Sequence, residues 1–251
     1  QNFSQVTNPP IDSLRENKVM SLKTRFGNLG NILDFDNLTQ ENIYVLDSPI
    51  LTNSQFKKFK KFFSKKTKII DCTFEIDSSL KERIDDIREE AETSVREGST
   101  CLILSDKNIS SQRASIPSIL IVGAVHSHLV KLGLRGYCSL NVECSDALDT
   151  HSFAVLIGVG ATTVNPYLAI DSIYQRFEKK LFGKSDFETC ISKFKKSIDA
   201  GLLKIMSKMG ISVISSYRGG CNFEAVGLSR AIVSDYFPGM SSRISGIGVK
   251  G

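Results

Sequence analysis

The sequence predicts an α/β fold made of repeated βα units around a parallel sheet. Short runs rich in β-branched residues alternate with amphipathic helical patterns along most of the chain, as expected for βα repeats. Residues 101–104 are apolar throughout, which is typical of a central parallel strand buried on both faces. The 251 residues contain no linker and no low-complexity segment, so we expect one domain.

The predicted strands and helices follow one another in a regular order. Helix 79–97 begins at a serine cap, and helix 117–132 begins with a proline that the first turn of a helix tolerates. Helix 55–63 sets phenylalanines opposite lysines, as an amphipathic helix does. The full predicted order is helix 14–20, strand 43–46, helix 55–63, strand 68–74, helix 79–97, strand 101–104, helix 117–132, strand 137–142, helix 146–157, strand 161–164, helices 168–180 and 186–209, and strand 211–215.

Periodicity leaves two arrangements of these elements open. Six strand candidates with helices between them fit a doubly wound sheet, and they also fit a (βα) barrel that lacks some of its units. Glycine is frequent from Gly219 to Gly251, and we expect an irregular tail there.

Composition and charge exclude several classes of protein. Lysine and arginine outnumber aspartate and glutamate by 32 to 27, but the lysine runs lie beside phenylalanines at helical spacing, which indicates solvated helix faces rather than a nucleic-acid surface. No apolar run approaches the roughly 18 residues of a membrane span, and we expect no signal peptide. The chain opens at Gln1 without a methionine, so we expect it to be processed or cut from a longer polypeptide.

Cysteine and histidine do not suggest a metal site. The six cysteines show no C-x-x-C spacing, and three of them lie in apolar runs, so we expect reduced, buried thiols. His126 and His128 are two apart on a predicted helix and point to different faces, so we expect structural roles for both. No Ser/His/Asp or Cys/His catalytic signature is present.

Two groups of polar residues are candidates for a site. Gly219 and Gly220 follow predicted strand 211–215, and Arg218 beside them supplies positive charge, so this turn is an anion-site candidate; the alternative is an ordinary tight turn. Enzymes built on barrels place their chemistry at the carboxyl ends of the strands. The polar candidates there are Asp106, Glu143 and Asn165, which form no recognised catalytic set.

An N-terminal strip is a third candidate. Its two prolines fix an extended path and remove two backbone donors, which leaves a stiff segment with polar flanks. Such a strip can line a passage, and the alternative is a surface turn that leads into helix 14–20. The strip consists of Thr7, Asn8, Pro9, Pro10, Ile11 and Asp12.

Six collinear strings span nearly the whole chain. They are QVTNPPIDSLRE at 5–16, HSFAVLIGVGA at 151–161, NPYLA at 165–169, GLLKIMSKMGIS at 201–212, SYRG at 216–219 and FEAVGL at 223–228. Together they resemble the central domain of the glutamate synthase large (alpha) subunit, and residues 242–244 match the same family. The chain departs from the family pattern at 220–222 and at Ser245.

The resemblance implies a place in a large multidomain enzyme. Such enzymes join a glutaminase domain, a central domain, an FMN barrel with an iron–sulfur cluster and a β-helix. Ammonia released from glutamine passes through an internal tunnel to the FMN site, where 2-oxoglutarate is reductively aminated and two glutamates result. Electrons come from ferredoxin or from a partner subunit that oxidises NAD(P)H.

For this chain the resemblance implies a connecting role without catalysis or cofactors of its own. Residues 1–251 would be the central domain without its extreme N-terminal part, an incomplete or degenerate TIM-like (βα) barrel related to the FMN domain, located in the cytoplasm or the plastid stroma. We expect the strip 7–12 to face the tunnel or the glutaminase domain, and neither nucleic acid nor membrane to be a partner. The residues expected to contact neighbouring domains are Tyr217, Arg218, Gly219 and Arg243.

Two alternatives stand beside the connecting role. One is a free-standing βα-barrel enzyme that binds a phosphorylated ligand near Arg218 and Gly219. The other is a purely structural interaction module. A gathering of acid and base residues at the carboxyl ends of the strands would favour the enzyme.

Overall fold

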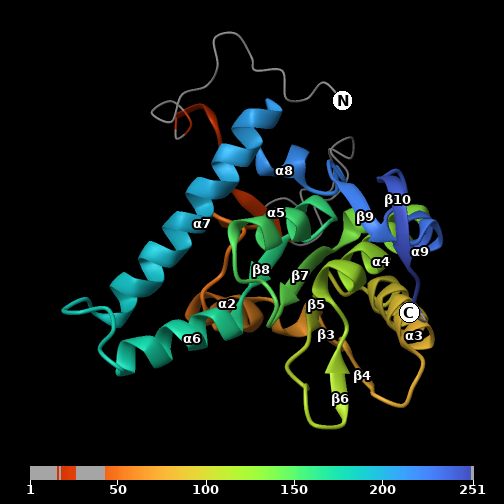
Figure 1. The fold of residues 1–251 in the computed structure, drawn as a ribbon, viewed down its shortest axis with the longest axis horizontal. Helices are drawn as coiled ribbons and strands as arrows, with labels where there is room; N and C mark the ends of the chain where they lie inside the picture. The colour runs from red at the N-terminus through yellow and green to blue at the C-terminus, as the bar shows by residue number, and fades with distance from the viewer. Residues whose placement is uncertain (1–15, 17, 27–42, 250–251) are drawn as a thin grey trace.

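A four-stranded parallel sheet lies at the centre of the protein, whose computed structural model describes residues 16, 18–26 and 43–249 (Figure 1). In spatial order its strands are β3 (Thr67–Asp71), β5 (Cys101–Ser105), β7 (Ser139–Glu143) and β8 (Thr163–Asn165). The register pairs Asp71 with Ser105, Ser105 with Glu143, and Glu143 with Asn165. These four polar residues therefore form one row along the carboxyl edge of the sheet.

The strands follow one another in chain order, with one helix between each pair of neighbours. These helices are α3 (Leu80–Arg96), α4 (Ser118–Lys131) and α5 (Thr150–Gly158). Their apolar sides are buried with Leu102, Leu140 and Val142 in the main core. Before α2 (Asn53–Phe62), the segment 49–51 runs parallel to β8, and the Leu51 N–H donates to the Val164 carbonyl at 2.9 Å.

This order decides between the two arrangements that periodicity left open. A doubly wound sheet reverses its strand order partway, whereas a barrel adds strands in one direction. Here β3, β5, β7 and β8 are added in one direction without a reversal. The α/β prediction and the prediction of an incomplete (βα) barrel are confirmed in this respect.

Helix α2 (Asn53–Phe62) packs on the other face of the sheet. Phe56 and Phe59 are buried with Cys101 and Ile103 of β5 in a second apolar cluster. A capping box at Thr52 fixes the start of the helix. The predicted solvated face is confirmed for the lysines at 57, 58, 61, 65 and 66, which are exposed. Beside this cluster, β1 (Thr24–Phe26) pairs antiparallel with β2 (Tyr44–Leu46).

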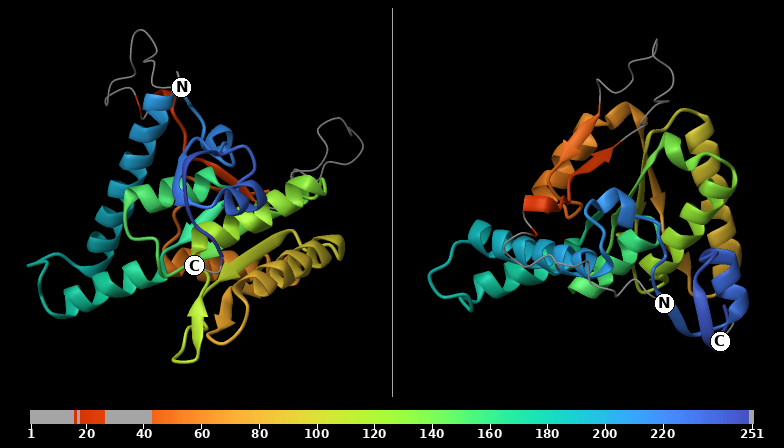
Figure 2. Two further views of the ribbon diagram at one scale, coloured as in Figure 1. Left: turned by 45° about the vertical axis from the view of Figure 1, so that its right-hand side comes forward. Right: turned by 90° about the horizontal axis from the view of Figure 1, so that it is seen from above.

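A helical hairpin projects from one side of the molecule. It consists of α6 (Tyr167–Glu178) and α7 (Phe187–Met209), and Figures 1 and 2 both show it extending away from the sheet. The rings of Tyr174 and Phe187 meet edge to face at 5.3 Å between centroids. Helix α7 begins at the side-chain cap of Asp186 and ends at Gly210, whose φ of 71° is the left-handed conformation that favours glycine.

The predicted strand 211–215 is wrong. Only Val213 makes a β-bridge, to Ser21, and helix α8 (Ile214–Tyr217) follows at once. Ile214 and Tyr217 are both buried, and their i,i+3 spacing suits one helical turn. The sequence predicted a strand here because β-branched residues favour strands, and the i,i+3 spacing was not recognised.

The irregular tail predicted after Gly219 is also wrong. Strand β9 (Glu224–Leu228), helix α9 (Arg230–Tyr236) and strand β10 (Ser241–Ile247) form one further βαβ unit, with the two strands parallel. Helix α9 begins at the side-chain cap of Ser229 and packs on α4. A short antiparallel pair, β4 (Thr73–Glu75) and β6 (Arg113–Ser115), and two 3-10 turns, η2 (Ser64–Lys66) and η3 (Arg135–Tyr137), complete the regular elements of the described residues.

Candidate functional site

The segment Tyr217–Gly219 docks on the carboxyl end of helix α5. The hydroxyl of buried Tyr217 donates to the Ala154 carbonyl at 3.1 Å, and burial raises the pKa of this phenol. The Gly219 N–H donates to the Ile157 carbonyl at 3.2 Å. Gly219 has a φ of +70°, and a Cβ there would lie 2.9 Å from Nε2 of His126, so the position suits only glycine.

Arg218 lies near a second arginine, and neither has a carboxylate partner within the described ranges. Arg135 donates from Nε to His126 Nδ1 at 3.0 Å and from Nη1 and Nη2 to the carbonyls of Cys138 and Gly160. The Nε and Nη2 atoms of Arg218 are shielded from solvent and have no hydrogen-bond partner. Burial, and then the charge of Arg135, lower the pKa of Arg218 to about 10.

His126 is held neutral between these two arginines. Burial lowers its pKa to about 4, and the charges of Arg135 and Arg218 act in the same direction. The expectation of a structural role agrees with the hydrogen bond from Arg135 to Nδ1. His128 lies elsewhere on α4, with its Nε2 2.9 Å from a carboxylate oxygen of Glu92.

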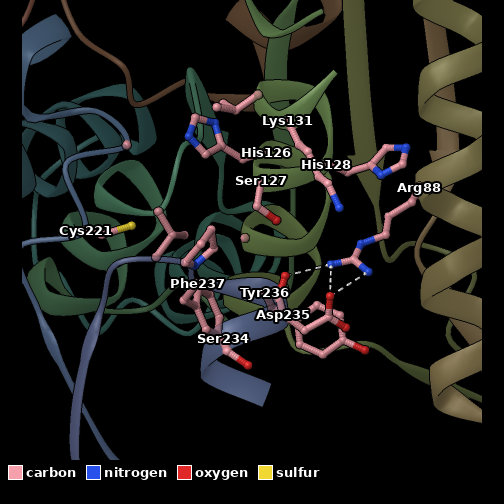
Figure 3. A pocket seen from close by; sticks show the side chains of 15 residues that line it. Arg88, His126, Ser127, His128, Lys131, Cys221, Ser234, Asp235, Tyr236 and Phe237 are labelled. Carbon is pink, nitrogen blue, oxygen red and sulfur yellow. Dashed lines mark hydrogen bonds and ion pairs between the residues drawn. The ribbon is translucent and has the colours of Figure 1, made fainter. Parts of the chain in front are cut away.

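A pocket of about 530 Å³ opens beside this segment, between α4 and α9 (Figure 3). At one end Arg88 donates to the carboxylate of Asp235 at 3.3 Å and to its carbonyl at 3.0 Å. At the other end the pocket reaches His126. Gly219, which lies close to Nε2 of His126, also lines the pocket. The further side chains that Figure 3 labels in its wall are Ser127, His128, Lys131, Cys221, Ser234, Tyr236 and Phe237.

The carboxyl edge of the sheet holds a second polar group, centred on Glu143. This buried carboxylate lies 2.9 Å from Lys107 and 3.3 Å from Lys60, and the Ser105 hydroxyl donates to it at 2.8 Å. Burial alone would raise the pKa of Glu143, but Lys107, Ser105 and Lys60 outweigh burial and lower it. Lys60 belongs to a run that the sequence placed on a solvated face, and its half-buried position beside the Phe56 ring, at 4.6 Å, was missed.

The other two candidates at this edge are also bound internally. Asp106 accepts from the N–H and the hydroxyl of Ser145 at 2.9 and 2.6 Å. The amide of Asn165 donates to the Leu51 carbonyl at 2.9 Å and to the Asn53 side chain at 3.0 Å. The structure thus brings Asp106, Glu143 and Asn165 to one edge, where Glu143 and Asn165 are engaged with their neighbours and Asp106 keeps one buried oxygen, Oδ1, without a hydrogen-bond partner.

The remaining predicted site residues lie apart from this edge. Arg243 is an exposed residue of β10 and pairs with Glu224 of β9 at 3.4 Å. The strip 7–12 lies outside the described residues. Of the predicted set, Tyr217, Arg218 and Gly219 lie together on α5, and Arg135 and His126 are the neighbours that sequence reasoning did not group with them.

The described residues do not fit an iron–sulfur cluster or a flavin. Five of the six cysteines are buried, and within the described ranges no three His, Cys, Asp or Glu side chains are grouped to hold a metal ion. The face of the sheet opposite α3, α4 and α5 is filled by the aromatic rings of α2. An FMN at the carboxyl edge would also have to displace the ion pairs of Glu143.

Comparison with known proteins supplies the family. The chain matches the glutamate synthase central domain family over residues 1–229. It is 58% identical to the large chain of glutamate synthase [NADPH] from Azospirillum brasilense, over 100% of this chain and 17% of that protein. The corresponding large chain from Bacillus subtilis is 42% identical, over 98% of this chain and 16% of that protein. The ferredoxin-dependent glutamate synthase of Pyropia yezoensis is 40% identical, over 98% of this chain and 17% of that protein.

Solved structures give a weaker likeness. A flavocytochrome b2 variant has a TM-score of 0.43 at 14% identity, over 74% of this chain and 44% of its own. A mandelate oxidase variant has a TM-score of 0.42 at 13% identity, over 53% of this chain and 37% of its own. TM-scores of this size do not establish a shared fold. The sequence matches are decisive: this chain, which spans about one sixth of the length of its curated relatives, belongs to the glutamate synthase central domain family.

Proposed function

We propose that this chain connects the glutaminase and FMN domains of a glutamate synthase large chain and forms part of the wall of its ammonia tunnel. The observation that carries the proposal is the family match over residues 1–229, which includes the strip 7–12. The internal pairing of Glu143 and Asn165 supports it, because groups already engaged with neighbours are not free to act on a substrate.

The wider enzyme would make L-glutamate from glutamine and 2-oxoglutarate. FMN and an iron–sulfur cluster would be bound by its neighbouring domains, since the described part of this chain suits neither. Relatives are named as NADPH, NADH and ferredoxin enzymes, so the electron donor of this one is either ferredoxin or a subunit that oxidises a nicotinamide. Two plant relatives are named as chloroplast proteins, and the cytoplasm and the plastid stroma are the compartments we propose. No helix of the described ranges has the length and apolarity that a bilayer crossing requires.

The strip 7–12 is proposed as the tunnel segment. Neutral ammonia both donates and accepts hydrogen bonds, so its passage needs small polar groups and carbonyls in a narrow path that excludes bulk water. Thr7 and Asn8 supply such groups, and the prolines at 9 and 10 hold the path rigid. Tyr217, Arg218, Gly219 and Arg243 are proposed to contact the neighbouring domains.

The replacement Asn8→Leu in the full-length enzyme tests the tunnel. We expect glutamine hydrolysis to continue while less glutamate is formed per glutamine hydrolysed, because ammonia escapes when its polar path is blocked. Both rates are measured in the same reaction with 2-oxoglutarate and reductant present. Gln112→Leu, a comparable change at an exposed loop residue, is the control. Unchanged coupling in the Asn8 variant would refute the tunnel role.

A free-standing enzyme that binds a phosphorylated ligand near Arg218 and Gly219 is not supported. The chain matches curated glutamate synthases over 98–100% of its length, as one part of much longer proteins. Titration of the purified chain with FMN, followed by flavin fluorescence, gives a separate check. We expect no binding, and tight binding would contradict a connecting domain without cofactor.

A further inference from the structure

One edge of the Arg218 guanidinium has no hydrogen-bond partner. Its Nε and Nη2 atoms are both shielded from solvent and both lack a hydrogen-bond partner among the described residues. These two nitrogens lie on one edge of the planar guanidinium and direct their N–H groups in parallel. That spacing matches the two oxygens of a carboxylate, as in bidentate arginine–carboxylate pairs.

Arg135 adds a second positive charge near Arg218, and the groups to which Arg135 donates carry no negative charge. The donors of Arg135 are all directed to neutral acceptors, namely His126 Nδ1, the carbonyls of Cys138 and Gly160, and the Thr162 hydroxyl. No acidic side chain of the described ranges pairs with either arginine. A buried charge without a partner destabilises a protein strongly unless an opposite charge is brought to it.

His126 adds a donor beside Gly219. Because its Nδ1 accepts from Arg135, the proton of the neutral ring is placed on Nε2. Nε2 faces Gly219, the residue next to Arg218, and has no hydrogen-bond partner within the described part of the chain. His126 lies at one end of the 530 Å³ pocket (Figure 3), and Gly219 also lines the pocket.

The pocket itself favours an acidic occupant. Arg88 and Lys131 contribute positive charge to its wall, and Asp235 is its one carboxylate among the described lining residues. Asp235 is already paired with Arg88. A cleft with an excess of one sign of charge concentrates groups of the opposite sign.

We propose that Arg218 binds a carboxylate beside Gly219, at the end of the pocket that His126 lines, with Arg135 nearby as a second positive charge. Arg218 does not itself line the pocket and its unpaired nitrogens are covered, so binding requires its side chain to turn toward that end. The carboxylate comes either from an aspartate or glutamate elsewhere in the full-length large chain or from a free dicarboxylate. The first source rests on the proposed function, because it needs the neighbouring domains. The site does not depend on the tunnel, so the Asn8→Leu experiment can fail while this proposal stands.

Titration with sodium glutarate, a plain dicarboxylate, tests the site on the purified chain. At a glutarate concentration about 100 times the dissociation constant, mass action predicts that the thermal midpoint rises by about 5–10 °C relative to sodium chloride of equal ionic strength. Arg218→Gln should abolish this rise, and Arg218→Lys, which keeps the charge but not the paired donors, should weaken it. Arg176→Gln removes an exposed arginine of α6 and is the control.

The full-length large chain distinguishes the two sources. If a carboxylate of the full-length chain itself fills the site, glutarate does not change the thermal midpoint of the full-length chain. Arg218→Met then lowers the midpoint of the full-length chain and raises that of the isolated chain. If the ligand is free, glutarate raises the midpoint of both proteins through Arg218. In either case binding raises the pKa of His126, which NMR of its ring protons reports. The proposal is overturned if glutarate does not raise the midpoint of the wild-type chain, or if the rise persists in Arg218→Gln.

Discussion

Gly123→Ala tests how closely α4 and α9 approach each other. Gly123 lies in the interior of α4, and a Cβ built there would overlap the Cε1 atom of Phe237. It would also lie 2.6 Å from Phe237 Cδ1 and 2.9 Å from the main-chain carbonyl oxygen of Tyr236. Phe237 is 4% exposed and Tyr236 is 2% exposed, so neither can move into solvent without opening the core.

Two opposing effects set the size of the change. Alanine in place of glycine stabilises a helix interior by about 1 kcal/mol. Overpacking a well-packed core costs about 1–3 kcal/mol. Because one of the overlapped atoms belongs to the main chain and cannot rotate away, we expect the larger part of that range, and a net loss of about 1–2 kcal/mol. For a protein of this size the thermal midpoint then falls by roughly 2–8 °C.

Urea denaturation followed by circular dichroism measures this loss, and thermal unfolding checks it. Gly136→Ala is the matched control, because no atom lies within 4 Å of a Cβ at that position and its φ is not in the left-handed range. Phe237→Leu in the Gly123→Ala background relieves the ring overlap but not the carbonyl contact, so we expect partial recovery. A Gly123→Ala variant as stable as wild type would show that α9 is free to shift away from α4.

Two further predictions concern His126 and Phe59. The pKa of His126 is about 4 in the fold against 6.5 for free histidine, so the unfolded chain binds the extra proton and stability falls as pH drops from 6.5 toward 4, by on the order of 3 kcal/mol. His126→Gln should flatten urea midpoints measured across this range, exposed His151→Gln should not, and a slope that persists without His126 contradicts the assignment. Phe59→Ala should cost about 3–5 kcal/mol in the same assay, because Phe59 is 0% exposed in the cluster under α2. Exposed Phe62→Ala should cost less than about 1 kcal/mol, and equal losses would refute the packing described for α2.

Much of the βα order could be predicted because the signals were local. The apolar run at 101–104 is strand β5, and the periodic segment 79–97 is helix α3 to within a residue or two at each end. Segment 211–215 was wrongly predicted as a strand because its β-branched residues favour a strand. In the structure only Val213 of this segment makes a β-bridge, to Ser21. In the glycine-rich tail, β9 and β10 pair across an intervening helix, and the glycines concealed both strands.

The site was predictable only in part, for a similar reason. Arg218 and Gly219 drew attention as neighbours in sequence, with glycine beside charge. Their partners come from other elements: His126 lies in α4 and Arg135 in the turn that follows it. Nothing in the local sequence pairs Arg135 with His126, because the hydrogen bond between them depends on how that turn folds back over α4.

The carboxyl edge of the sheet explains why a βα series can serve a connecting rather than a catalytic role. In barrel enzymes this edge presents groups that are free to exchange protons with a substrate. Here both oxygens of Glu143 are engaged by Lys60 of α2, and Lys107 and Ser105 each bind one of them as well. The lowered pKa keeps this carboxylate ionised at neutral pH, so it is a poor proton donor and its lone pairs are already used. The same contacts fasten α2 to the loop that follows β5. The edge that would carry reactivity in an enzyme is therefore used to hold α2 against the sheet, which gives the stiffness that the proposed connecting role requires.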